Sequence, residues 1–252
     1  MPRYKAVIAY DGTNYVGFQR QDNGLSVQEA IETTLKKITQ QEIIIYGSGR
    51  TDSGVHAMGQ VIHFDFPYEK DEEKLRFALD TQTPNDIAVR SLEKVSADFH
   101  ARYQAHEKTY HYRLNIGRPR NPFKRFYAAY YPYELDVERM QQAANYLLGT
   151  HDFTGCCASG SSVEDKVRTI YEASVKKVSD DELLFVFRGN GFLYKMIRIL
   201  VGTLIKIGNG RLPVDQFQKI IETKDRHLAG PTAHPEGLYL MEVNYHCDEE
   251  TC

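Results

Sequence analysis

The chain has 252 residues, 42% of them hydrophobic and 26% charged, with a net charge of −3, which is an ordinary globular composition. It has no apolar run of the roughly 18–20 residues that cross a bilayer, and no apolar signal-peptide core follows Met1, so membrane-spanning and secreted proteins are disfavoured. Its cysteines, Cys156, Cys157, Cys247 and Cys252, lack the spacing of a zinc site or a disulfide framework, which favours reduced thiols and a cytoplasmic location.

The first half of the chain predicts the element order β-α-β-β-α-β. Ser26 and Glu29 form a capping box at the start of a helix whose apolar residues recur every three or four positions. Alternation, as in His63-Phe64-Asp65-Phe66, indicates a strand with one buried face. The expected strands cover 4–10, 43–46, 60–66 and 87–92, and the expected helices cover 26–38 and 72–79.

The second half repeats this order, with a hairpin expected around the turn Ser179-Asp180-Asp181. Each half therefore resembles a split βαβ, ferredoxin-like unit. We expect an α+β fold of two such βαββαβ units, residues 1–105 and 106–252, with largely antiparallel sheets abutting around a central basic cleft. The expected strands of the second half cover 108–114, 168–178, 182–188 and 238–245, and the expected helices cover 136–148, 192–207 and 213–221.

The segment 99–127 combines basic and aromatic side chains. It holds seven basic residues against the single acid Glu107, so the segment carries +6 and the rest of the chain −9. It also holds seven aromatic residues. Because lysine and arginine neutralise phosphates and aromatic rings stack on exposed bases, this composition favours contact with RNA. A solvated strand edge in front of a tyrosine-rich core is the alternative.

The glycine-rich stretch 47–56 contains one carboxylate, Asp52, between two predicted strands. A phosphate-binding loop would carry a lysine and lead into a helix, and this stretch does neither. Asp52, His56, His63 and Asp65 are possible metal ligands, but residues on an irregular turn do not define a coordination geometry. A tight turn in which Asp52 only caps the backbone also stays open.

Several short motifs occur in a fixed order along the chain. They are 10–19 (YDGTNYVGFQ), 49–57 (GRTDSGVHA), 99–103 (FHARY), 108–113 (KTYHYR), 192–198 (FLYKMIR) with Val201-Gly202, and 235–239 (PEGLY). With these blocks, the sequence resembles the tRNA pseudouridine synthase A family over nearly the whole chain. It departs from the family at Ser48 and Ser53, where alanine is more usual, and at Gly155-Cys156, where the family usually has Ser-Phe. None of these departures removes a charged or aromatic residue of the expected site.

The resemblance implies that Asp52 is the nucleophile of a uridine isomerase. Pseudouridine formation breaks the bond between N1 and C1′ and rejoins the base through C5, without redox change or phosphate transfer, so no cofactor is expected and no metal is needed. By resemblance, Arg50 helps to open the RNA helix and Tyr110 is the platform for the flipped base. Tyr112, two residues on along the same face of the strand, is a rival to Tyr110.

Arg198 is the candidate partner of Asp52. It lies in a predicted helix that is apolar almost all round and therefore buried, and a buried arginine needs a carboxylate. Gly202, one turn later, leaves room for the close approach of another chain segment or a base. The alternative is an arginine on an exposed polar strip.

The resemblance further implies a homodimer that acts on tRNA positions 38 to 40 in the anticodon stem-loop, with no membrane involvement. Two rival functions stay open: an RNA-binding module without catalysis, and a metal-dependent hydrolase using Asp52 and His63. The expected phosphate contacts, which would position the RNA rather than specify its sequence, are Arg102, Lys108, Arg113, Arg118 and Arg120.

Overall fold

The computed structural model describes residues 1–160 and 163–245. The chain divides into two compact units, the first formed by Met1–His106 and Tyr239–Cys252 and the second by Glu107–Leu238. Cys156 and Cys157 are buried free thiols, whereas Cys247 and Cys252 lie outside the described residues. None of the described helices combines the length and apolar character that crossing a membrane requires.

The first unit contains a sheet in the order β4-β1-β3-β10. Its strands β1 (Arg3–Tyr10), β3 (His56–Asp65) and β4 (Ile87–Val95) are antiparallel, with Val7 opposite Val61 of β3. The short strand β2 (Tyr46–Gly47) pairs with β3, directly before the glycine-rich loop. Strand β10 (Leu238–Tyr245) runs parallel to β3, with Tyr239 opposite His56.

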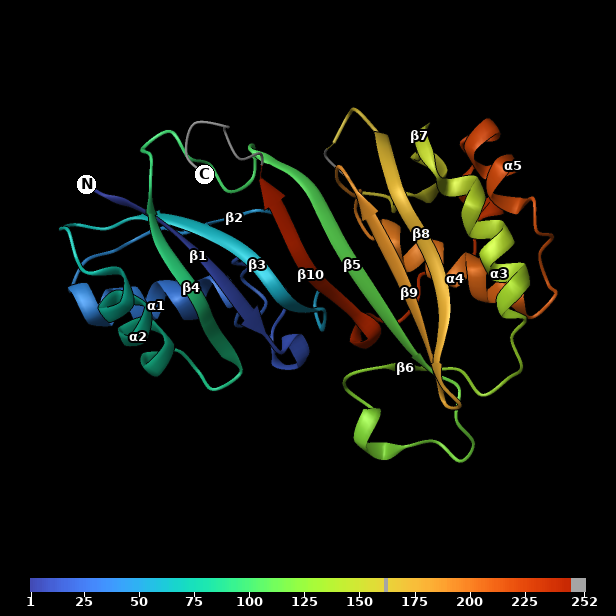
Figure 1. The fold of residues 1–252 in the computed structure, drawn as a ribbon, viewed down its shortest axis with the longest axis horizontal. Helices are drawn as coiled ribbons and strands as arrows, with labels where there is room; N and C mark the ends of the chain where they lie inside the picture. The colour runs from blue at the N-terminus through green and yellow to red at the C-terminus, as the bar shows by residue number, and fades with distance from the viewer. Residues whose placement is uncertain (161–162, 246–252) are drawn as a thin grey trace. The chain divides into compact units, whose positions relative to one another are not determined.

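Two helices cover one face of this sheet, α1 (Val27–Thr39) and α2 (Glu72–Gln82) (Figure 1). The predicted cap of α1 is present, because the Ser26 hydroxyl oxygen accepts a hydrogen bond from the Glu29 amide at 3.2 Å. Every second residue of β1 is buried, as expected for a strand with one face toward the core.

The second unit contains a sheet in the order β5-β9-β8-β7. The long antiparallel strands are β5 (Ala105–Asn115), β8 (Val167–Ser179) and β9 (Glu182–Gly189), and β7 (Gly149–Asp152) is the far edge. The short strand β6 (Ala129–Tyr130) is parallel to β5. The helices α3 (Val137–Ala144), α4 (Met196–Gly208) and α5 (Gln216–Thr223) lie on the same side of β8 and β9 (Figure 1). Single 3-10 turns are η1 (Gly12–Asn14), η2 (Pro122–Lys124), η3 (Asn145–Leu147), η4 (Thr154–Cys156), η5 (Arg226–Leu228) and η6 (Pro235–Gly237).

The α+β fold and its mainly antiparallel pairing confirm the sequence-based expectation. One assignment is wrong: β10, expected to complete the second half, pairs with β3 of the first unit. Gly59 permits this, because a Cβ there would lie 2.3 Å from the Met241 carbonyl oxygen. Helix α4 begins at Met196, whereas the sequence predicted a start at 192. Lys195 has a left-handed φ of 56°, which is incompatible with a right-handed helix, so the helix cannot include residues before Met196.

Candidate active site

The Asp52 loop, residues 47–56, connects β2 to β3 and is held by the preceding segment 12–18. The Phe18 amide donates to the Thr51 carbonyl oxygen at 3.1 Å, and the Gly54 amide donates to that of Tyr15 at 3.4 Å. Within the loop, the Val55 amide donates to the Asp52 carbonyl oxygen at 3.1 Å. The backbone on both sides of Asp52 is therefore tied to the rest of the first unit.

Two glycines outside the loop make this contact possible. A Cβ on Gly12 would lie 2.0 Å from the Val55 carbonyl oxygen, and one on Gly17 would lie 2.7 Å from that of Thr51. Gly17 also has a φ of +114°, which side chains rarely adopt. The block 10–19 therefore builds the wall against which the Asp52 loop packs. Sequence reasoning matched this block to the family but assigned it no role.

Buried polar side chains hold the two ends of the loop. The Ser48 hydroxyl, fully buried, donates to Gln60 Oε1 at 2.6 Å, and Gln60 Nε2 donates to the Gly49 carbonyl oxygen at 2.9 Å. The Thr51 and Tyr10 hydroxyls are 2.8 Å apart. Because each of these buried polar groups has a hydrogen-bond partner, the loop is held rigidly although it is polar. Ser48, unusual for the family, is accommodated by Gln60.

The loop presents Asp52 half-buried and Arg50 exposed, in the same unit. Thr51, between them, is buried.

The alternative metal site is not assembled. His56 Nδ1 accepts a hydrogen bond from the Gly12 amide at 3.0 Å, and His63 Nδ1 accepts one from the Ala101 amide at 3.1 Å. Asp65 forms an ion pair with Arg3 at 2.8 Å. In the described ranges, 1–160 and 163–245, no three His, Cys, Asp or Glu side chains are grouped so that they could hold a metal ion.

In the second unit, β5 carries both tyrosines that compete for the role of base platform. Tyr112 is fully buried, and its hydroxyl donates to the His234 carbonyl oxygen at 2.9 Å. Burial raises the pKa of Tyr112, so the hydroxyl stays protonated. Tyr110 packs edge-on against Phe192 with ring centroids 5.3 Å apart. Both tyrosines are buried, but Tyr112 is 0% exposed whereas Tyr110 keeps 8% exposure, so Tyr110 is the better candidate.

Arg198 lies in the first turn of α4, half-buried as the apolar helix predicts. Its Nε donates to the Ala233 carbonyl oxygen at 2.7 Å, and the Ala233 amide donates back to the Arg198 carbonyl oxygen at 2.9 Å. The close approach expected at Gly202 is made by Pro231, whose carbonyl oxygen would be 1.8 Å from a Cβ there. The segment 230–233 therefore orients the Arg198 guanidinium.

The basic segment 99–127 is less available for RNA than its composition indicates. Arg113 Nε and Lys124 Nζ contact the buried carboxylate of Glu182 at 2.6 and 3.0 Å, and Lys124 also contacts Asp181 at 2.8 Å. Burial raises the pKa of Glu182, but the hydrogen bonds from these two cations lower it below its ordinary value. Arg113, expected to contact phosphate, is therefore paired with Glu182, while 44% of its side chain stays exposed. The remaining expected contacts are exposed at Arg102, Arg118 and Arg120 and half-buried at Lys108.

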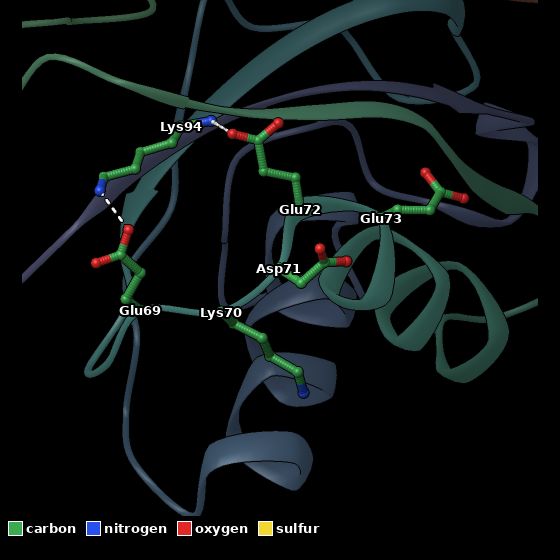
Figure 2. A pocket seen from close by; sticks show the side chains of 6 residues that line it. All are labelled: Glu69, Lys70, Asp71, Glu72, Glu73 and Lys94. Carbon is green, nitrogen blue, oxygen red and sulfur yellow. Dashed lines mark hydrogen bonds and ion pairs between the residues drawn. The ribbon is translucent and has the colours of Figure 1, made fainter.

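An open hollow lies at the N-terminus of α2, and none of the expected site residues lines it. Figure 2 shows four carboxylates and two lysines around it, with Lys94 contacting Glu69 at 2.6 Å. Carboxylates repel the phosphates of RNA, so this hollow is not a candidate for the substrate site.

Comparison with known proteins identifies the family of this chain. A model of the tRNA pseudouridine synthase family matches residues 6–104 and 143–246. The chain is 61% identical to tRNA pseudouridine synthase A of Streptococcus gordonii, over 97% of this chain and 99% of that protein. The chain belongs to the tRNA pseudouridine synthase family. As a tRNA pseudouridine synthase, it is an isomerase that converts uridine into pseudouridine in tRNA.

The chain is also similar to a second streptococcal protein and to a solved structure. It is 63% identical to tRNA pseudouridine synthase A of Streptococcus pneumoniae strain Taiwan19F-14, again over 97% of this chain and 99% of that protein. Among solved structures, a Cbf5-Nop10-Gar1 complex matches 80% of this chain and 45% of its own chain, with 14% identity and a TM-score of 0.37.

The structure groups the expected site residues of this synthase by unit. Arg50 and Asp52 lie on one loop of the first unit, and Tyr110 and Arg198 lie in the second. Sequence reasoning missed the glycine wall formed by Gly12 and Gly17. Their position in a matching block was the only signal, because nothing local shows which backbone a glycine must approach.

Proposed function

We propose that this synthase uses Asp52 as its nucleophile, without a cofactor, on uridines of the anticodon stem-loop. The observation that carries the proposal is the placement of Asp52, a half-buried carboxylate of the family signature on a loop whose backbone is held from both sides. A carboxylate held in this way adds to an electrophilic carbon without first being reoriented. The N1–C1′ bond breaks, a C5–C1′ bond forms, and the bond to Asp52 breaks again, which regenerates the carboxylate. C5 loses a proton and N1 takes one up, so the product is an isomer of the substrate.

The other site residues act on charge and position. Arg198, with its Nε directed to Ala233, supplies a cation that keeps the Asp52 carboxylate ionised when water is excluded. Arg50, exposed on the same loop as Asp52, inserts into the RNA helix and occupies the space of the flipped nucleotide. Tyr110 stacks on the target base, and its hydroxyl assists proton transfer at C5.

The tRNA is held by its phosphates. Arg102, Arg118 and Arg120 are exposed and Lys108 is half-buried, and cations of this kind position a folded RNA through its backbone. By the family resemblance we further propose a cytoplasmic homodimer that shares one tRNA. Light scattering of the protein with and without tRNA tests that stoichiometry.

Tritium release from tRNA labelled at uridine C5 tests the proposal. With EDTA present, the wild type should release tritium, whereas Asp52→Asn and Asp52→Ala should release none while still binding tRNA. Asp22→Asn, at an exposed aspartate of the same unit, is the matched control and should behave as wild type. A fully active Asp52→Ala protein would overturn the assignment, and loss of activity in EDTA would restore the metal-dependent alternative.

Tyr110→Phe separates the ring from the hydroxyl. The ring still stacks, so tRNA binding should persist while turnover slows by roughly 100-fold, within the range of general acid–base catalysis. Wild-type turnover would remove the hydroxyl from the mechanism.

A further inference from the structure

Four rings in the first unit form a cluster beside β2, in which His63 and His100 meet edge-on at 61°. The cluster is here named the Tyr46–Tyr103 platform (Tyr46, His63, His100 and Tyr103). The ring centroids of Tyr46 and His63 are 5.1 Å apart and nearly parallel, at 19°. Those of His63 and His100 are 4.7 Å apart, and those of His100 and Tyr103 are 4.2 Å apart. The function proposed above uses none of these rings.

The outer rings of the platform are open to solvent and the inner one is not. Tyr103 is 76% exposed and Tyr46 50% exposed, whereas His63 is 2% exposed. Large exposed aromatic residues are costly unless a ligand covers them, and two in one cluster form an apolar surface. A planar ligand that stacks on Tyr103 would cover the most exposed ring of the platform.

Backbone amides fix both inner histidines, and the buried one, His63, is uncharged at pH 7. His63 Nδ1 accepts from the Ala101 amide at 3.1 Å, and His100 Nδ1 accepts from the Arg102 amide at 3.2 Å. Burial, with the positive charges of His100 and Arg3, lowers the pKa of His63 to about 4, so this ring is neutral at pH 7. The platform therefore offers neutral ring faces.

The positive charge of the platform stands at its rim. The exposed Arg102 guanidinium lies 5.9 Å from the Tyr103 ring centroid. Arg3 is the other nearby cation, and it holds Asp65 at 2.8 Å and the Phe99 carbonyl oxygen at 2.9 Å. Arg3 thereby neutralises Asp65 and fixes the turn that carries the platform. Neutral rings with a cation at the rim match a nucleotide, which joins a flat base to a phosphate.

We propose that the Tyr46–Tyr103 platform binds one unpaired nucleotide of the substrate tRNA, its base stacked on Tyr103 and its phosphate contacting Arg102. The proposal rests on the tRNA substrate of the family and concerns a nucleotide other than the one that is isomerised. Tyr46 pairs with His63 in the sheet, and its strand β2 leads directly into the Asp52 loop. A nucleotide anchored there fixes the RNA relative to that loop.

Binding of unmodified tRNA to single variants tests the platform. Tyr103→Ala should raise Kd roughly tenfold, since stacking of a base on an aromatic ring contributes about 1–3 kcal/mol. The loss should appear in KM rather than in kcat, and Tyr103→Phe should bind as wild type. Tyr68→Ala is the matched control, because Tyr68 is a 48% exposed tyrosine of the same unit outside the platform.

A single-stranded oligoribonucleotide carrying 2-aminopurine gives a readout independent of catalysis. Its fluorescence should be quenched by the wild type, by Asp52→Asn and by Tyr68→Ala, and much less by Tyr103→Ala. Arg102→Gln should lower the slope of log K against log salt by about one. If Tyr103→Ala binds tRNA and the oligonucleotide as wild type does, the platform is not an RNA site.

Two further outcomes keep this proposal separate from the others. An active Asp52→Ala protein would overturn the catalytic assignment and leave the platform standing. A change of molecular mass in light scattering for Tyr103→Ala, with unchanged affinity for tRNA, would show instead that the platform binds a second copy of the chain.

Discussion

The Val55 carbonyl oxygen lies where a side chain on Gly12 would begin: a Cβ there would be only 2.0 Å away. The same glycine donates its amide to His56 Nδ1 at 3.0 Å. These contacts hold the C-terminal end of the Asp52 loop against the segment 12–18. The atoms that a Cβ on Gly12 would meet are backbone atoms of Val55, which cannot move aside as a flexible side chain could. The position of the loop therefore depends on the absence of a methyl group at residue 12.

Gly12→Ala should therefore destabilise the protein and slow catalysis together. Overpacking of this kind costs about 1–3 kcal/mol, and displacement of the loop misplaces Asp52. Urea unfolding and tritium release measure the two effects. Gly191→Ala is the control, because a Cβ on Gly191 would meet only the Arg168 side chain at 3.6 Å. Unchanged activity in Gly12→Ala would mean that the wall does not position Asp52.

Arg198→Ala should abolish tritium release and lower the free energy of unfolding by about 1–3 kcal/mol, because buried polar groups lose a charged hydrogen-bond donor. Compared with Arg198→Ala, Arg198→Lys should restore more of the stability than of the activity. Lysine keeps the positive charge, but its ammonium group cannot reproduce the oriented hydrogen bonds of the guanidinium. Arg211→Ala, an exposed arginine after the same helix, is the control. A double-mutant cycle with Asp52→Asn tests their pairing: additive stability changes would show that Asp52 and Arg198 do not interact.

Asp152→Asn should reduce stability at neutral pH and leave it unchanged in acid. Hydrogen bonds from Lys224 and then Thr154 lower the pKa of Asp152 from its ordinary 3.8 to about 2. A carboxyl with a lowered folded-state pKa stabilises the fold above pH 4, and this contribution is lost as the pH falls through about 2. Because solvent screens the pair, the expected cost at pH 7 is about 1 kcal/mol.

Urea unfolding of wild type and Asp152→Asn at a series of pH values measures this difference. Asp180→Asn is the control, since Asp180 is fully exposed and its ion pair with Lys177 should add little. A difference between wild type and Asp152→Asn that persists at pH 2 would contradict the assigned ion pair.

Arg120→Gln and Lys124→Gln should have opposite signatures, although both remove a cation from the same segment. Arg120 is exposed, so its loss should weaken tRNA binding and lower the salt slope by about one. Lys124 holds Asp181 and Glu182, so its loss should lower stability and leave the salt slope unchanged. Filter binding at several salt concentrations and urea unfolding separate the two. An unchanged slope for Arg120→Gln would remove Arg120 from the RNA contacts.

Local order along the chain was determined by the sequence itself. The cap at Ser26, the alternation of β3 and the apolar faces of α1 and α4 each predict an element that the structure contains. These features are readable because hydrophobic periodicity and capping depend on neighbours within a few residues. The order of the matching blocks indicated Asp52 in the same way, since it needs only the identity of each residue.

Contacts between residues far apart in the chain were decided only by the tertiary structure. Glu182 pairs with Arg113 and Lys124 of the basic segment, β10 pairs with β3 of the first unit, and Gly12 and Gly17 allow the backbone of the Asp52 loop to approach closely. Each of these contacts depends on which surfaces meet when the helices and strands pack together, and the amino-acid composition does not contain that information. A charge count over 99–127 therefore overstated the cations available to RNA, because it could not show which of them a buried carboxylate had already engaged.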